Sequence, residues 1–163
     1  MSSSDRRLFL LGLAALPLAA CGFTPAYGPQ GGATALRGRI AVQAPVTRED
    51  FDFTARVESR LGRAQAAAYD LAYTLSATRE SGGITATNVT TRYTLKGTAT
   101  FSLTERATGT RVAGGTVKGF TSWSATGTTV AGLAAEDDAA RRLSVLLADQ
   151  VITRLIAAAP TLK

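Results

Sequence analysis

Cys21 is the residue whose type and position most clearly indicate a chemical reaction, and it is the only cysteine in the chain. It ends the segment Leu18-Ala19-Ala20-Cys21, which has the form of a bacterial lipobox: an aliphatic residue, two small residues and a cysteine. Before it, a pair of arginines precedes an uncharged apolar run over residues 8–20, the order typical of a secretory signal. We therefore expect residues 1–20 to be removed and the new N-terminal cysteine to carry acyl chains.

A lone cysteine is more often a small buried apolar side chain, so its position must decide between the two interpretations. The apolar run before Cys21 is shorter than the roughly 20 residues that span a bilayer, and no second cysteine could pair with this one. Acyl chains anchor a protein because each buried methylene contributes about 0.8 kcal/mol, and a stable anchor needs more than one chain. An aspartate directly after the lipidated cysteine often signals retention in the inner membrane, so Gly22 favours the outer membrane. The paired arginines fit both general secretion and twin-arginine export, so the export route stays open.

Residue types suited to catalysis are scarce in this sequence. It contains no histidine, which rules out a Ser/His/Asp triad and removes the commonest general base and metal ligand. Glu136, Asp137 and Asp138 are consecutive, and consecutive residues of a helix point in different directions. Acids near a helix start interact favourably with the helix dipole, so we expect these three to form neither a catalytic pair nor a metal site. The sequence therefore predicts no enzyme, no metal site and no cofactor.

Basic residues are the remaining candidates for binding. The chain has 18 Lys+Arg against 12 Asp+Glu, a formal net charge of +6. A basic exported protein can meet acidic lipid head groups, phosphorylated glycolipid or an acidic protein, whereas the export signal argues against nucleic acid. Two interpretations stay open for the basic residues of the central hairpin: a patch that meets phosphates, or charges on a solvated sheet face. These residues are Arg92, Lys96, Arg111 and Lys118.

The elements that must position these residues follow from hydrophobic periodicity and turn residues. We expect a lipidated N-terminus and flexible tether over residues 21–38, rich in Gly, Pro, Ala and Thr, and a single domain over residues 39–160. The predicted elements are a strand at 40–42, a helix from Thr47 to Gly62, a strand at 69–77, a turn at 81–83, a long strand at 84–104, a turn at 107–110, a strand at 111–124 with a bulge near its glycines, and a helix from about 133 to Pro160. This order predicts an α+β fold, a four-stranded mostly antiparallel sheet with two amphipathic helices packed on one face.

Three segments together resemble the LptE family of lipopolysaccharide-assembly lipoproteins, in the form found in alphaproteobacteria. They are Cys-Gly-Phe-Thr-Pro-Ala-Tyr at 21–27, the threonine-rich stretch at 84–95 and the alanine-rich helix at 134–155. The likeness covers nearly all of the mature chain in the family's order. It implies a lipid-anchored outer-membrane protein facing the periplasm, without enzymatic activity or a cofactor. Such a protein would plug the β-barrel LptD, help the barrel assemble, and contact lipopolysaccharide during its insertion into the outer leaflet.

Under this resemblance, the four basic residues of the hairpin become candidates for contact with lipopolysaccharide or with the barrel. No family motif at these positions assigns the contact residue by residue. The alternative function is an auxiliary lipoprotein of a lipid-transport system that faces the periplasm and binds phospholipid. That class would need an enclosed apolar cavity, which the sequence neither demands nor excludes.

Overall fold

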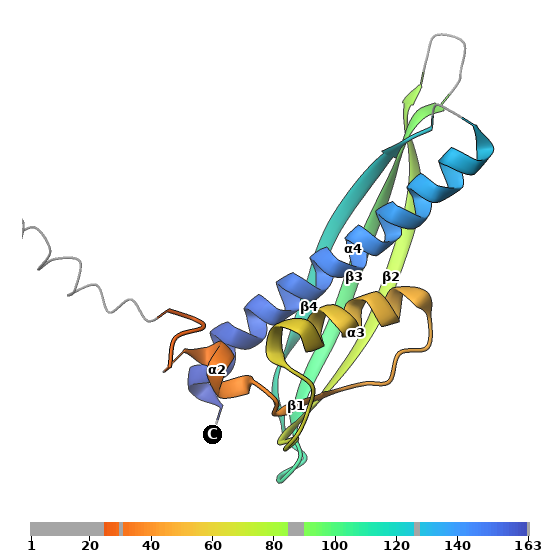
Figure 1. Ribbon diagram of the computed structural model, residues 1–163. Helices are drawn as coiled ribbons and strands as arrows, with labels where there is room; N and C mark the ends of the chain where they lie inside the picture. The colour runs from red at the N-terminus through yellow and green to blue at the C-terminus, as the bar shows by residue number, and fades with distance from the viewer. Residues whose placement is uncertain (1–24, 30, 85–89, 126–127, 163) are drawn as a thin grey trace, which may run out of the picture.

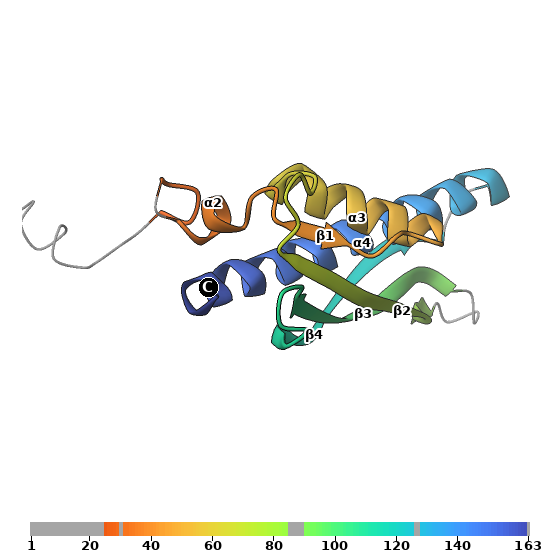
Figure 2. The same ribbon diagram turned by 90° about the horizontal axis from the view of Figure 1, so that it is seen from below.

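The computed structural model describes residues 25–29, 31–84, 90–125 and 128–162. The elements, in chain order, are α2 (Gly32–Leu36), β1 (Ile40–Val42), α3 (Arg48–Leu61), β2 (Tyr69–Ile84), β3 (Thr90–Glu105), β4 (Arg111–Ser124), α4 (Thr129–Ala158) and the short 3-10 helix η1 (Ala159–Thr161). Helices α3 and α4 lie together on one face of the sheet (Figure 1). Seen from below, no described element covers the other face (Figure 2). This arrangement confirms the predicted α+β fold with its four-stranded, mostly antiparallel sheet.

The sheet has the strand order β1-β2-β3-β4. β1 runs parallel to the start of β2, with Ile40 opposite Tyr69, and the other strands pair antiparallel. β3 therefore has a partner on both sides, whereas β4 forms an edge of the sheet. Side chains alternate between the two faces of a strand, and the residues of β3 that face the helices are buried from Gly97 onward. The most deeply buried of these are Ala99, Phe101 and Leu103.

A pair of glycines lets α4 lie close to the sheet. Gly97 on β3 pairs with Gly119 on β4. A Cβ at Gly97 would lie 2.7 Å from Cδ2 of Leu143, and a Cβ at Gly119 would collide with Leu146, so α4 occupies the space of both missing side chains. The bulge predicted near the glycines of β4 is confirmed beside Gly114. The register shift at Leu103/Thr104 skips Val112, because Leu103 pairs with Ala113 and Thr104 pairs with Arg111.

Helix α3 begins and ends where the sequence predicts. The Thr47 hydroxyl accepts a hydrogen bond from the Asp50 N–H at 3.2 Å, and the Asp50 carboxylate accepts one from the Thr47 N–H at 2.9 Å. This reciprocal capping box satisfies two backbone donors at the helix start. Partial burial acts to raise the pKa of Asp50, but hydrogen bonds from Thr47 and Val46 outweigh it and lower the pKa below its usual value. The predicted apolar stripe is buried and consists of Phe53, Val57 and Leu61.

Helix α4 supplies the other half of the core. The Thr128 hydroxyl caps its first turn by accepting a hydrogen bond from the Ala131 N–H at 3.3 Å. The helix begins at Thr129, earlier than predicted. Its first turns extend beyond the buried core, so Leu133 is 63% exposed and the apolar pattern there did not mark the helix start. By length and composition alone the segment Thr129–Thr161 could cross a membrane, but here its apolar face packs on the sheet. The buried apolar residues are Ala139, Leu143, Leu147, Ala148, Val151, Ile152 and Leu155.

The turn predicted at residues 81–83 is wrong. These residues continue β2, whose last residue, Ile84, pairs with Thr90 at the start of β3. Gly83 has a φ of 64°, yet its carbonyl accepts a hydrogen bond from the Thr91 hydroxyl, which keeps this part of the chain in the ladder. Ile84 therefore belongs to β2 and not to the long strand in which the sequence placed it. The link between the two strands, residues 85–89, lies outside the described residues.

The flexible tether predicted over residues 21–38 is wrong for its second half. Residues 32–36 form α2, in which Ala33 and Leu36 are each only 2% exposed. A Cβ at Gly32 would lie 2.6 Å from the carbonyl oxygen of Ile156, so α2 packs against the end of α4. Two apolar side chains among small and polar residues were enough to dock this segment on the core. Cys21 lies outside the described residues.

Candidate functional site

The four basic candidates all belong to the open face of the sheet, opposite the helices. On β3, Arg92 pairs with Ser124 and Lys96 pairs with Phe120. On β4, Lys118 pairs with Thr98 of the same open face. Arg92, Lys96, Arg111 and Lys118 are all exposed. The alternation inferred from the sequence therefore assigned Arg92 and Lys96 to the correct face.

The structure brings two of these residues together in one depression. Lys96 and Lys118 both line a hollow of about 500 Å³ on the open face. The Lys96 ammonium forms an ion pair with the Glu80 carboxylate at 2.7 Å, whereas Lys118 has no ion pair among the described residues. The other lining residues are Ser76, Thr78, Glu80, Gly97, Thr98, Gly119 and Phe120.

Arg92 and Arg111 lie outside this hollow, on either side of it along the strands. Arg92 pairs with Ser124 near the far end of the hairpin, and Arg111 pairs with Thr104 at the opposite end. The Arg111 guanidinium lies over Gly114, where a Cβ would collide with it. The predicted patch of four residues is therefore a central lysine pair with one arginine toward each end.

Hydroxyl groups and one exposed aromatic ring complete the open face. Thr94 and Ser122 share a hydrogen bond at 3.3 Å across β3 and β4, and Thr100 and Thr116 share one at 3.2 Å. Phe120 is 67% exposed beside the two lysines. Two ammonium groups can hold an anion as point charges, hydroxyls can donate to its oxygens, and the ring offers an apolar contact. This arrangement suits an amphiphilic anion.

Sequence reasoning missed Glu80 and Phe120 as parts of this hollow. Phe120 could have been found from alternation, because it lies two residues from Lys118 and therefore on the same face. Glu80 depends on the register between β2 and β3, which the misplaced turn concealed.

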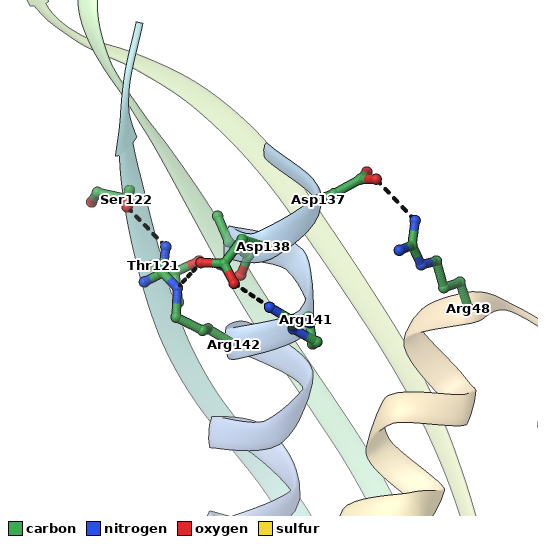
Figure 3. A network of polar contacts seen from close by, with 8 residues as sticks. Arg48, Thr121, Ser122, Asp137, Asp138, Arg141 and Arg142 are labelled. Carbon is green, nitrogen blue, oxygen red and sulfur yellow. Dashed lines mark hydrogen bonds and ion pairs between the residues drawn. The ribbon is translucent and has the colours of Figure 1, made fainter. Parts of the chain in front are cut away.

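The acids near the start of α4 pair with arginines in different directions. Asp137 pairs with Arg48 of α3 at 2.9 Å, and Asp138 points away from it toward Arg141 and Arg142 (Figure 3). Hydrogen bonds from Arg142 and then Arg141 lower the pKa of Asp138 below its usual value. No described group of three or more Cys, Asp or Glu side chains could hold a metal ion.

A second cleft, of about 610 Å³, lies between the start of α3, strand β2 and α4. Leucines from the sheet and α4 line it, but carboxylates from both helices line it as well. These acids are Glu49, Asp50, Glu136 and Asp137. Glu136 and Asp137 are each paired with an arginine, so Glu49 and Asp50 are the two acids that disfavour an anionic head group in this cleft, because like charges repel.

The comparison that decides the family covers most of the described domain. A family model for LptE, described as lipopolysaccharide-assembly, matches residues 37–155. The chain belongs to the LptE family. All four basic candidates lie within the matched range, and the family description places this LptE-family protein in lipopolysaccharide assembly. No curated protein matches the chain.

Solved structures show the same fold. A candidate lipoprotein from Caulobacter crescentus is similar with a TM-score of 0.64 and 18% identity, covering 79% of this chain and 96% of that one. Rare lipoprotein B from Shewanella oneidensis has a TM-score of 0.57 and 14% identity, covering 76% and 95%. A minor lipoprotein from Acinetobacter baumannii has a TM-score of 0.52 and 17% identity, covering 73% and 89%. Because all three identities are below 20%, these structures show that the chain shares their fold and nothing more.

Proposed function

We propose that this LptE-family protein is an outer-membrane lipoprotein, anchored through acylated Cys21 and facing the periplasm, that plugs an LptD-like β-barrel. In this role it helps the barrel assemble and helps lipopolysaccharide enter the outer leaflet, without catalysis and without a cofactor. The observation that carries the proposal is the open, hydroxyl-rich face of a long sheet whose other face packs against α3 and α4.

The dimensions of the sheet suit a barrel lumen. β2 and β3 have 16 residues each, so each is about 50 Å long at roughly 3.3 Å per residue. The apolar band of an outer-membrane barrel is about 25 Å tall and its interior is polar. A strand pair of this length can extend through the barrel. Its threonines and serines can exchange hydrogen bonds with the polar wall.

The lysine hollow supports contact with the phosphates of lipopolysaccharide. Lys118 is exposed and has no ion pair among the described residues, so a phosphate can bind it without breaking an existing ion pair. The pair between Lys96 and Glu80 has side chains 59% and 48% exposed, and an exposed pair of this kind contributes about 0–1 kcal/mol. A phosphate can therefore replace Glu80 as the partner of Lys96 at low cost. Phe120 is placed to meet an apolar part of the same ligand.

A second candidate is the phospholipid-binding auxiliary of a lipid-transport system. The cleft beside β2 is the observation in its favour, because leucines line part of it. The carboxylates of Glu49 and Asp50, which line the same cleft, weigh against an anionic phospholipid, so we place this function second.

The deciding experiment is affinity purification of the C-terminally tagged full-length protein from detergent-solubilised outer membranes, with mass spectrometry of what is bound. We expect a large β-barrel in one-to-one ratio. Inner-membrane transporter subunits or bound phospholipid, without a barrel, would overturn the plug proposal and favour the second candidate.

Contact with lipopolysaccharide is tested by reversing one charge in the hollow. We expect Lys118→Glu to weaken binding to purified lipopolysaccharide by roughly tenfold, the loss of about one charged hydrogen bond. The matched control is Arg154→Glu, which makes the same change of charge at an exposed position of α4. Equal weakening by both variants would mean that only net charge matters and that the hollow is not the contact.

A further inference from the structure

Two loops at one end of the molecule interlock through their backbones. One follows α2 and contains Arg37-Gly38-Arg39, and the other follows α3 and contains Gly62-Arg63. The Gly38 N–H donates a hydrogen bond to the carbonyl of Leu61 at 2.8 Å, and the Gly38 carbonyl accepts one from the Gln65 N–H at 2.9 Å. Both glycines have a positive φ, 70° and 77°, a conformation that other residues rarely adopt. The interlock places arginines from two distant parts of the sequence side by side.

A fourth arginine joins them from the last turn of α3. The Arg60 guanidinium lies 5.1 Å from the centre of the Tyr27 ring, and its Nε donates a hydrogen bond to the Tyr27 hydroxyl at 3.1 Å. Tyr27 is 52% exposed. We call Arg37, Arg39, Arg60 and Arg63 the arginine collar. Glu58 binds Arg63 at 2.9 Å, and the guanidinium of the half-buried Arg39 lies 5.4 Å from the centre of the Tyr69 ring.

Charge is distributed unevenly between this end and the opposite one. Glu49 and Asp50 lie in the first turn of α3, whereas Arg60 lies in its last turn. α4 runs in the same direction beside α3, as the pairs Arg48–Asp137 and Arg56–Asp149 show, and its acidic run is also near its start. The acidic run of α4 is neutralised by arginines, in the pairs Arg48–Asp137, Arg79–Glu136 and Arg142–Asp138. At the collar, by contrast, only Arg63 has an acidic partner among the described residues.

The chain enters the domain at the collar, and the path from Cys21 is short. The Gly28 N–H donates to the Pro25 carbonyl at 2.9 Å, and the Ala33 N–H donates to the Ala26 carbonyl at 3.0 Å, so the chain is folded onto the domain from Pro25 onward. Four residue steps separate Cys21 from Pro25, which at most span about 14 Å. An acylated Cys21 therefore holds this end of the domain close to the lipid head groups.

We propose that the arginine collar rests on anionic phospholipid head groups of the membrane in which Cys21 is anchored. The proposal depends on the lipidation of Cys21 proposed above and adds a second membrane contact to it. Basic residues held near an anionic surface are attracted to it within about one Debye length, roughly 8 Å at physiological salt. Tyr27, with an apolar ring and a polar tip, suits the boundary between head groups and acyl chains. A lipid anchor alone leaves the domain free to tilt, whereas anchor and collar together hold the collar end at the membrane surface and leave the opposite end, where β2 is joined to β3, free to enter the barrel.

The test uses the mature chain, residues 21–163, with Cys21→Ser so that no acyl chain contributes to binding. This chain contains the whole described core, from Ala33 to Ala159. Binding is measured by co-flotation with vesicles of phosphatidylglycerol and phosphatidylcholine in equal parts, and with vesicles of phosphatidylcholine alone. We expect binding to the anionic vesicles only, weakening as salt is raised. Changing Arg37, Arg39, Arg60 and Arg63 together to Gln should reduce the partition coefficient at least tenfold.

The matched control removes four positive charges near the starts of α3 and α4, by changing Arg48, Arg79, Arg141 and Arg142 to Gln; all four are exposed. We expect this variant to bind the vesicles within about twofold of the parent, because these side chains lie at the opposite end of the two helices from the collar. Circular dichroism checks that both variants fold. Equal losses in the two variants, or equal binding to both kinds of vesicle, would overturn the collar. If Cys21 is not lipidated, the mass of the wild-type protein will lack the acyl chains. If the plug proposal is wrong, no barrel will be purified with the tagged protein.

Discussion

The close approach of α4 to the sheet at Gly97 predicts that one added methyl group destabilises the fold. A Cβ at this position would lie 2.7 Å from Cδ2, 3.0 Å from Cγ and 3.1 Å from Cδ1 of Leu143. Leu143 is only 3% exposed, so it cannot swing into solvent. Overpacking of this kind costs about 1–3 kcal/mol, and replacing a strand glycine by alanine returns about 0.5–1 kcal/mol. We expect Gly97→Ala to lower the free energy of unfolding by about 1–2 kcal/mol.

Urea unfolding of the mature Cys21→Ser chain, followed by circular dichroism, measures this loss. The matched control is Gly115→Ala, because a Cβ at Gly115 would lie 3.8 Å from Cε1 of Phe101, an ordinary contact. We expect the control to be as stable as the parent or more stable. In thermal unfolding, the Gly97→Ala variant should lose roughly 4 °C of Tm per kcal/mol.

A double-mutant cycle tests the cause. Leu143→Ala alone should cost about 2–5 kcal/mol, because it leaves a cavity. In the double variant the new methyl group no longer meets the leucine. Its loss of unfolding free energy should therefore be smaller than the sum of the two single losses by about 1 kcal/mol or more. Additive losses, or a Gly97→Ala variant as stable as Gly115→Ala, would refute this account of how α4 packs.

Three further changes test other parts of the fold by the same unfolding assay. Asp50→Asn should lower the free energy of unfolding by about 1 kcal/mol at neutral pH. Folding lowers the pKa of Asp50, so the stability that its carboxylate contributes is present above the unfolded pKa near 3.9 and is lost as pH falls through the folded pKa. The parent and the variant should therefore become equally stable in acid. Tyr73→Phe should cost about 1–3 kcal/mol, because the buried Thr54 hydroxyl loses its partner at 3.0 Å; a smaller loss in the Thr54→Val background would confirm the pair. Leu36→Ala should cost about 2–5 kcal/mol if α2 is part of the core, whereas a flexible segment would show no change.

Local signals predicted the elements whose causes are local. The helix from Thr47 to Gly62 was predictable because its cap, apolar stripe and final glycine all lie within one segment. The end of β2 was not, because Gly82 is held in the ladder by pairing with Arg92, a partner that no local pattern reveals. Docking of α2 was hidden for a similar reason. Its buried Leu36 belongs to a core whose other members are distant in sequence.

The candidate site divides in the same way. Alternation along one strand assigned a face to Arg92 and Lys96. Which basic residues share a hollow depends instead on the register between β3 and β4. That register places Lys96 opposite Phe120 and Thr98 opposite Lys118. Register is set by the whole hairpin, so the sequence could suggest a patch but not its central pair.

The topology also separates the two interpretations of the basic hairpin residues. Charges that protect a sheet from aggregation act on an edge strand, where backbone groups are unpaired. Arg111 and Lys118 lie on β4, an edge, so protection could explain them. Arg92 and Lys96 lie on β3, which has a partner on each side, and a charge there protects no edge. For these two residues edge protection is therefore not the explanation, and a contact with phosphate or with a barrel wall stays the role that we propose. Lys96 is the one of the two that lies in the hollow.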